Sequence, residues 1–211
     1  MESTASVSVV KKAHHGKKAP KIPDNLIWEM IDGKPLYRRG YKDVLRKTKK
    51  IEDIMGSSGY QSAIIAYLVK LLVRSLDDSF EVYSSESGLH LEKNTNFAAD
   101  IAIYQNLPAQ AITKKYVNIP PKIIIEVDIS IDPDSMHEIE YIENKTRKIL
   151  DFGVEKVIWI LTYVRKVIVA TPNNTTWLMV DWSENIEILD GITFNIQNFL
   201  TERGIDPLSI K

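Results

Sequence analysis

The apolar positions of the chain follow a helical period in several places. A helix is predicted from Gly59, because apolar residues recur there at helical spacing: Ile64, Leu68, Leu71, Leu72 and Leu76. A second helix is predicted over residues 138–152, ending near Gly153, from the apolar residues Ile139, Ile142, Ile149 and Leu150. A short helix is expected near 196–200. Such helices bury one apolar face, so we expect them to pack on a sheet.

Short runs of β-branched and aromatic residues predict the strands of that sheet. The first are FEVYSS (80–85), GLHLE (88–92) and DIAIY (100–104), with Asn94 and Asn96 expected as turn residues before DIAIY. The later ones lie in PPKIIIEVDIS (120–130), EKVIWILTY (155–163), KVIVAT (166–171), WLMVDW (177–182) and IEILDG (186–191). The order of helix, strands, helix and strands predicts an α/β sandwich in which helices flank a central mixed β-sheet.

Two acids interrupt the apolar strand in PPKIIIEVDIS. Residues two apart share one face of a strand, so Ile124, Glu126 and Asp128 are expected to point one way, and Val127 and Ile129 the other. A buried carboxylate is costly unless it is paired, hydrogen-bonded or bound to a metal. Two carboxylates repel each other, and a divalent cation is a common remedy. The strand therefore points to a metal site.

Two other charged residues complete this candidate site. Asp100 opens the strand DIAIY, and it can approach Glu126 if the two strands are neighbours. Lys145 lies one helical turn after Tyr141 and one turn before Ile149, so it borders the buried stripe of the second helix. An ammonium group there can reach the carboxylates, orient a water molecule and stabilise charge on a phosphate.

Composition narrows the kind of protein. With 211 residues and 44% hydrophobic content, the chain can bury one sizeable core, so we expect one domain over 23–211 and a disordered basic tail over 1–22. It has no cysteine, which excludes disulfides and thiolate metal sites and favours a hard ion such as Mg²⁺. No apolar run reaches the roughly 18 residues of a membrane helix, so we expect a cytoplasmic protein without membrane contact.

The charge is unevenly distributed along the chain. Residues 1–50 hold 13 Lys and Arg against 5 Asp and Glu, whereas the remainder is acidic. The segment YRRGYKDVLRKTKK at 37–50 combines seven basic residues with two tyrosines, a mixture that suits phosphate contact and base stacking. Charge runs are more often simply solvated surface, which is the alternative interpretation. The predicted nucleic-acid contacts are Arg38, Arg39, Lys42, Arg46 and Lys47.

Three stretches resemble the Uma-type family of restriction endonucleases, within the PD-(D/E)XK nuclease superfamily. They are AADIAIY at 98–104, with Ala99 where a proline is usual, PPKIIIEVDIS at 120–130, and KTRKILDFGVEKVIWIL at 145–161. Ser130 comes one residue later than in the family signature, and the likeness extends over residues 30–205. The resemblance implies a restriction-endonuclease-like α/β fold.

The resemblance also implies an activity and residue roles. Asp100, Glu126 and the backbone carbonyl of Val127 would hold Mg²⁺, with Mn²⁺ as a substitute, and Lys145 would be the catalytic lysine, moved from the strand to the following helix. The expected reaction is metal-dependent hydrolysis of phosphodiester bonds in nucleic acid, DNA in the first place. Removing Asp100, Glu126 or Lys145 is expected to abolish cleavage without unfolding the protein. A homodimer is expected only by analogy, because cutting both strands needs two sites.

Asp128 is the main departure from the family pattern. It stands two residues after Glu126, where superfamily members usually carry lysine and Uma-type relatives more often an aliphatic residue. It is interpreted as a third ligand, as an acid that supports the ligands, or as a charge that weakens the site. The last possibility favours the second candidate function, a nuclease fold that binds nucleic acid or a protein without cleaving.

Each of these residues, taken singly, can also have a purely structural role. Asp100 can be a turn-bonding acid at a strand start, and Lys145 a helix lysine that extends to solvent. A third candidate class is an unrelated α/β protein with acids on an exposed strand face, which predicts a solvent-accessible Glu126. The chain contains neither a GxGxxG nor a Walker pattern, so nothing in it indicates a nucleotide-binding enzyme.

Overall fold

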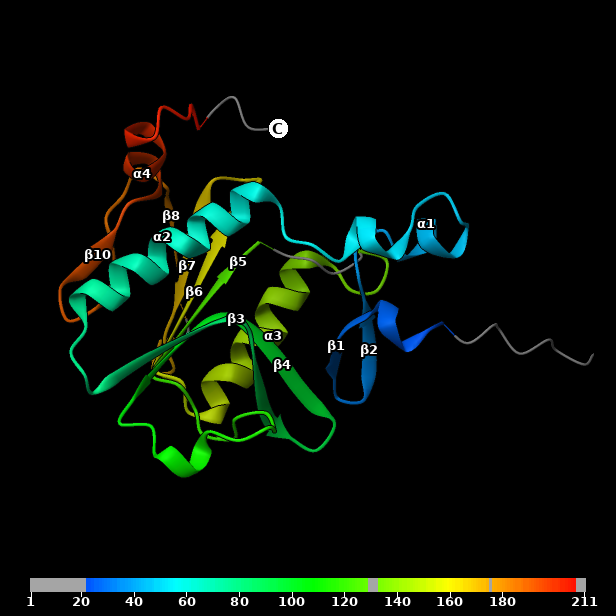
Figure 1. Ribbon diagram of the computed structural model, residues 1–211, viewed down its shortest axis with the longest axis horizontal. Helices are drawn as coiled ribbons and strands as arrows, with labels where there is room; N and C mark the ends of the chain where they lie inside the picture. Colours follow the sequence, from blue (N-terminus) through cyan, green and yellow to red (C-terminus); the bar gives the residue numbers. More distant parts are fainter. Residues whose placement is uncertain (1–21, 129–132, 175, 208–211) are drawn as a thin grey trace, which may run out of the picture.

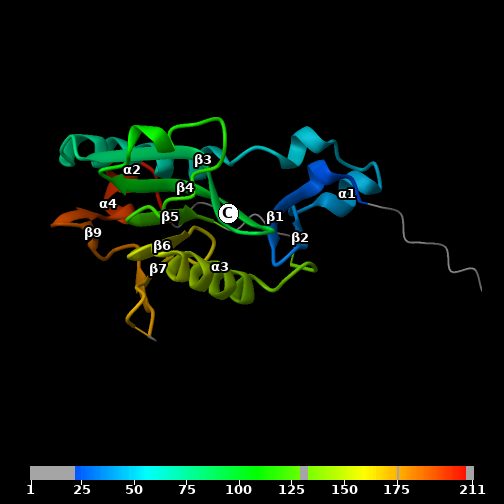
Figure 2. The ribbon, with the colours of Figure 1, turned by 90° about the horizontal axis from the view of Figure 1, so that it is seen from below.

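The computed structural model describes residues 22–128, 133–174 and 176–207, so the predicted tail lies outside the described residues apart from residue 22. Within these ranges, eight strands form one mixed sheet and two further strands form a small second sheet. Helices cover both faces of the large sheet (Figure 1). Figure 2 shows α2 (Gly59–Ser75) and α3 (Glu138–Phe152) on opposite sides of it. This arrangement confirms the predicted fold class.

The strands of the large sheet follow the order β2-β1-β4-β5-β6-β7-β8, with β3 paired to β4. Their bounds are β1 (Ile27–Ile31), β2 (Lys34–Tyr37), β3 (Phe80–Glu92), β4 (Thr95–Gln105), β5 (Ile123–Val127), β6 (Lys156–Leu161), β7 (Lys166–Ala170) and β8 (Leu178–Asp181). β5 and β6 pair in parallel through the crossover helix α3, and the other neighbours are antiparallel. The small sheet consists of β9 (Ile186–Leu189) and β10 (Ile192–Phe194).

Shorter helices complete the chain. They are α1 (Tyr41–Leu45), α4 (Ile196–Glu202) and the 3₁₀ turns η1 (Asp24–Leu26), η2 (Ile51–Ile54) and η3 (Ala109–Ala111). β1, β2 and α1 lie at one end of the molecule, and β9, β10 and α4 at the other (Figures 1 and 2).

Two buried cores sandwich β5. On one face, Ile125 and Val127 pack in a cluster with Leu68 of α2 and Leu200 of α4. On the other face, Ile124 packs in a cluster with residues of α3, β1 and β6. A strand that is buried on both faces consists of apolar residues almost throughout, as IIIEV does. Glu126 alternates onto the α3 face, so its carboxylate is enclosed by protein rather than by water.

The helices agree well with the sequence pattern. α2 begins at the predicted Gly59, where the Ser58 hydroxyl caps the helix by accepting the N–H of Gln61 at 3.1 Å. α3 spans the predicted 138–152 and ends at Gly153, whose φ of 115° lies in the left-handed region that favours glycine. The interpretation of Ile139 is wrong, because it is 70% exposed and lies outside the buried stripe of α3.

The strand predictions need two corrections before β5. The runs 80–85 and 88–92 form one strand, β3, because a bulge at Ser85 and Glu86, both with positive φ, bends the strand without ending its pairing to β4. Asn96 is not a turn residue: β4 already begins at Thr95, and Asn96 pairs with both His90 and Met30.

Two hairpins escaped the sequence analysis. Both turn through an Asp-Gly pair with positive φ at both residues, Asp32–Gly33 between β1 and β2 and Asp190–Gly191 between β9 and β10. Asp-Gly between apolar runs is a strong hairpin signal. The first hairpin bears directly on the candidate site, because β1 supplies one of its residues.

Candidate active site

The site lies beside an unpaired stretch of β4. β1 and β5 both pair with the edge of β4 that faces away from β3, but at different places. Met30 of β1 lies opposite Asn96, and Ile125 of β5 lies opposite Ile101. Between these two contacts, the backbone of Ala98 binds side chains instead of a neighbouring strand. The opening allows charged side chains to reach the sheet backbone from the α3 face.

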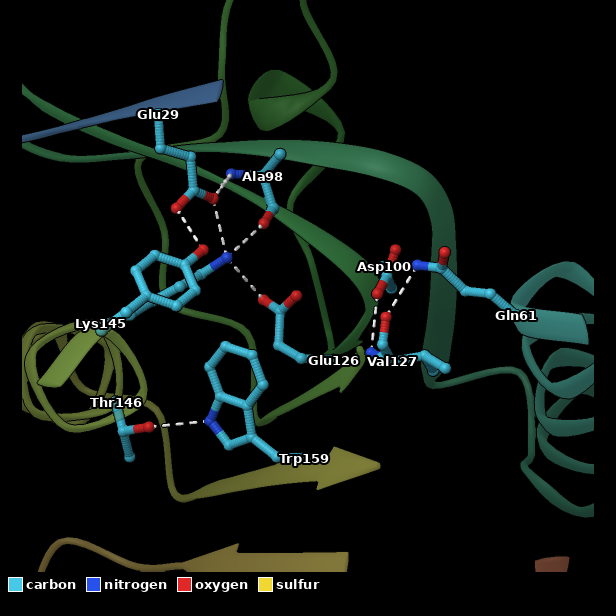
Figure 3. Close-up of polar contacts among 10 residues, drawn as sticks. Glu29, Gln61, Ala98, Asp100, Glu126, Val127, Lys145, Thr146 and Trp159 are labelled. Atoms are coloured by element: carbon cyan, nitrogen blue, oxygen red, sulfur yellow. Dashed lines mark hydrogen bonds and ion pairs between the residues drawn. The ribbon is translucent and has the colours of Figure 1, made fainter. Parts of the chain in front are cut away.

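Glu126 lies in the middle of this region and is 5% exposed. Its Oε1 is 3.1 Å from the Nζ of Lys145, an ion pair whose angles are not those of a hydrogen bond (Figure 3). The third candidate class, with acids on an exposed strand face, predicted an accessible Glu126 and is wrong on this point.

Lys145 is buried at 1% exposure and reaches three acceptors. Its Nζ donates to Glu29 Oε1 at 2.7 Å and to the Ala98 carbonyl at 3.0 Å, and it faces Glu126 as described. The rings of Phe97, Tyr141 and Trp159 surround the ammonium, with centroids at 5.4, 5.7 and 5.7 Å. The alternative of a helix lysine that extends to solvent is therefore wrong.

Glu29 of β1 is the principal residue that the sequence analysis missed. Its side chain is 2% exposed and binds two neighbours besides Lys145. The Tyr141 hydroxyl donates to Glu29 Oε2 at 2.6 Å, and the Ala98 N–H donates to Oε1 at 3.3 Å. The Asp-Gly turn after WEMI was the available signal, since it places Glu29 on a strand between apolar neighbours.

Asp100 and Gln61 bind the backbone N–H and the backbone carbonyl of Val127. The Val127 N–H donates to Asp100 Oδ2 at 2.7 Å, and the Gln61 amide Nε2 donates to the Val127 carbonyl at 2.7 Å (Figure 3). A carbonyl oxygen has two lone pairs, so this hydrogen bond leaves one for another partner. Gln61 was not predicted, because it comes from the first turn of α2 and no local pattern links it to β5.

Asp128 does not share a face with Glu126 in the expected way. β5 ends at Val127, and Asp128 takes the left-handed conformation with φ of 66°. The alternation of side chains along β5 therefore stops before Asp128, so the prediction that Asp128 shares a strand face with Glu126 is wrong. Ile129, which was predicted to lie on the opposite face, is outside the described residues. Both carboxylate oxygens of Asp128 accept hydrogen bonds from Thr162, Oδ1 from its N–H and Oδ2 from its hydroxyl, each at 2.7 Å. Asp128 thus ties the end of β5 to the β6–β7 turn.

The predicted nucleic-acid contacts lie in or beside α1. Arg38 stacks on Trp28 with its guanidinium carbon 4.6 Å from the ring centroid, and Arg39 pairs with Glu138 at 2.5 Å. Lys42 forms an ion pair with Asp134. Arg46 and Lys47 are exposed. The segment is therefore accessible in part, and two of its cations face acids at the start of α3.

Burial shapes the ionisation of the cluster. It raises the pKa of Glu126 from 4.5 to about 8 and that of Asp100 from 3.8 to about 6, the latter against the lowering effect of the Val127 hydrogen bond. For Lys145, burial alone would lower the pKa, but the charges of Glu126 and Glu29 raise it well above 10.5. Both acids have a raised pKa and lie beside a lysine that stays charged. A further positive charge at this site would stabilise their ionised forms.

These shifts predict a pH dependence of stability. Between pH 4.5 and about 8, folded Glu126 holds a proton that the unfolded chain has released, so the free energy of unfolding should fall as the pH rises through this window. Asp100 acts in the same direction between 3.8 and about 6. We expect the fall to be smaller in Glu126→Gln by an amount on the order of a few kcal/mol. Urea unfolding at several pH values measures it, and parallel curves for the two proteins would contradict it.

The oxygen atoms of the site can be compared with the ligands that a divalent metal ion requires. Among residues 22–128, 133–174 and 176–207, no group of three or more His, Cys, Asp or Glu side chains is arranged to hold a metal ion. The oxygens nearest to such a role are the carboxylates of Asp100 and Glu126 and the carbonyl of Val127, which belong to adjacent strands. Carboxylate and carbonyl oxygens are the ligands of hard ions, which take water molecules for their remaining positions. In chemical type, the three donors fit Mg²⁺ or Mn²⁺.

A search of known proteins found similarity at the level of structure. The chain is similar to a solved structure from Anabaena variabilis ATCC 29413, described as a "putative nuclease belonging to DUF820". The TM-score is 0.58 and the sequence identity 16%, over 82% of this chain and 89% of that one. No protein-family model and no curated protein matches the sequence. The likeness shows that the two chains share a fold.

The membrane prediction can be compared with the helices. None of those in the described part of the chain combines the length and the apolar character needed to cross a bilayer.

Proposed function

We propose that the protein is a metal-dependent endonuclease that hydrolyses phosphodiester bonds in nucleic acid, DNA in the first place. One observation carries the proposal: Lys145 and Glu126 are buried side by side, at 3.1 Å, in a fold shared with a protein described as a nuclease. An ion pair of this kind is costly to bury for stability alone. It is expected where the charges serve a reaction.

The proposed ligands of Mg²⁺, or of Mn²⁺ in its place, are Asp100, Glu126 and the carbonyl of Val127. A divalent cation held there lowers the pKa of a coordinated water and neutralises the scissile phosphate. Gln61 fixes the orientation of the Val127 carbonyl, and Asp100 holds the backbone N–H of the same residue. Burial raises the pKa of Glu126 to about 8, and the charge of Lys145 opposes this rise and so favours the ionised carboxylate. Lys145 also supplies positive potential to orient the attacking water.

The substrate-binding side of the proposal rests on charge. We propose that Arg38, Arg39, Lys42, Arg46 and Lys47 contact phosphates, since the segment adjoins the start of α3 through the pairs Arg39–Glu138 and Lys42–Asp134. Substrate phosphates would compete with these two acids for the cations. A homodimer that cuts both strands is part of the proposal by symmetry alone.

The second candidate function is a nuclease fold that binds nucleic acid or a protein partner without cleaving. This function was suggested by the additional acid Asp128, because its negative charge would repel the proposed carboxylate ligands if it faced them. In the structure, Thr162 occupies both oxygens of Asp128, which favours a structural role at the strand end. This geometry supports the cleaving function over the binding-only one.

The test is cleavage of a supercoiled plasmid by the purified protein with Mg²⁺, with Mn²⁺ and with a chelator. We expect nicking with either ion and none with the chelator. A folded protein that shifts the mobility of the DNA but cuts it with neither ion would instead establish the binding-only function. A protein that does neither would remove double-stranded DNA as the substrate.

A further inference from the structure

We infer that Glu29 is a positioning residue, which fixes the ammonium of Lys145 beside Glu126 so that Glu126 is left free to bind a cation. The inference rests on the proposed function and deepens it, because it assigns a role to a residue outside the β4, β5 and α3 motif. The argument concerns geometry: which contacts hold Lys145 in place, and which of them survive when Glu126 takes another partner.

Lys145 is closer to Glu29 than to Glu126, and of these two acids it makes a hydrogen bond to Glu29. An ammonium group has three N–H donors. Two of them make hydrogen bonds, to Glu29 at 2.7 Å and to the Ala98 carbonyl at 3.0 Å, whereas the contact with Glu126 is an ion pair at 3.1 Å without hydrogen-bond angles. A cation that draws on Glu126 therefore removes the longest of the three contacts and leaves both hydrogen bonds intact.

Glu29 is itself held rigidly. Its Oε2 accepts the Tyr141 hydroxyl at 2.6 Å, and its Oε1 accepts the Ala98 N–H at 3.3 Å. Its partners thus come from α3 and β4, while its own backbone belongs to β1. Figure 3 shows the ammonium between Glu29 on one side and Glu126 on the other. A carboxylate held by two partners besides Lys145 is a firm anchor for the flexible lysine side chain.

Without this anchor, Lys145 has Glu126 as its remaining carboxylate partner within the described cluster. The lysine side chain would then move toward Glu126 and occupy the oxygen that the cation needs. A displacement of about 1 Å in a catalytic group can lower a reaction rate on the order of 100-fold. A purely structural role for Glu29 would change the stability of the protein but not the place of Lys145.

The experiment uses Glu29→Asp, which keeps the charge but shortens the side chain by one methylene, and Tyr141→Phe, which removes one support of Glu29 without changing any charge. Glu140→Asp on the exposed face of α3 is the matched control. The first readout is the ¹H–¹³C spectrum of lysine-labelled protein without metal, with the Lys145 signal assigned by its loss in Lys145→Arg. Three rings lie within 5.4–5.7 Å of Nζ, so ring currents make this signal a reporter of position.

We expect the Lys145 signal to move toward that of a free lysine in both variants and to stay in place in the control. The second readout is plasmid cleavage, for which we expect kcat to fall on the order of 100-fold with little change in KM for DNA. An unmoved signal in both variants overturns the inference, and so does a moved signal with unchanged kcat. If the parent protein cuts nothing, the proposed function fails, while the spectrum still decides whether Glu29 fixes Lys145.

Discussion

Glu126→Gln is expected to abolish cleavage while the protein remains folded. The amide has the shape of the carboxylate but no charge, and the site loses the more deeply buried of its two proposed carboxylate ligands. Loss of a partner that only supports a metal ligand lowers activity about 10- to 100-fold, so loss of the ligand itself should exceed about 100-fold. The fold should tolerate the change, because Lys145 keeps its two hydrogen bonds to Glu29 and Ala98.

The measurement is plasmid nicking with Mg²⁺ by equal amounts of parent, Glu126→Gln and Glu140→Gln. The last variant removes an acid from the exposed face of α3 and should cut like the parent. Circular dichroism and thermal unfolding establish that each protein is folded. Cleavage by Glu126→Gln within about tenfold of the parent would remove Glu126 from the proposed ligands.

Lys145→Met is expected to destabilise the protein strongly as well as to abolish cleavage. Glu29 and Glu126 would remain buried without their cation, and breaking a buried pair in this way costs about 3–5 kcal/mol. The sequence alone led to the expectation that loss of Lys145 leaves the fold intact. The structure changes this expectation, because Lys145 is the shared partner of two carboxylates that are each 5% exposed.

Urea unfolding of parent, Lys145→Met and the double variant Glu29→Gln/Lys145→Met measures this effect. The double variant should recover much of the lost stability, because the unpaired carboxylate of Glu29 is gone, yet it should not regain cleavage. Lys70→Met, an exposed lysine on α2, is the control for loss of a helix lysine. If Lys145→Met is as stable as Lys70→Met, the ion cluster does not support the fold.

The sequence predicted those elements whose pattern is set by local burial. The start of α2 and both ends of α3 were predicted correctly, because each helix buries one stripe at helical spacing. The acid in β5 was conspicuous because both faces of that strand are buried. Asp128 was misplaced because alternation holds only while the strand lasts, and the chain turns into the left-handed region one residue after Val127.

The partners of the candidate site were harder to predict. Glu29 meets Lys145 across 116 residues, and Gln61 meets Val127 across 66. No periodicity encodes which distant segment will lie against an opening in a sheet. The backbone pairing of β1 with β4 that brings Glu29 there comprises one residue pair in the described part of the chain, Met30 opposite Asn96. The Asp-Gly turn could have revealed the hairpin, but its docking place depends on the tertiary structure.

The separation between Glu29 and Lys145 also bears on how the protein folds. β3 and β4 are neighbours in sequence and can pair early, whereas the contact between Glu29 and Lys145 closes a loop of 116 residues. Long loops lose more entropy on closure, and contacts between distant residues slow folding. We therefore expect the charged cluster to form late, after the sheet on which it rests. On the ribosome, the cluster stays incomplete until α3 has been synthesised, so a nascent chain carries Glu29 and Glu126 before it carries the lysine that joins them.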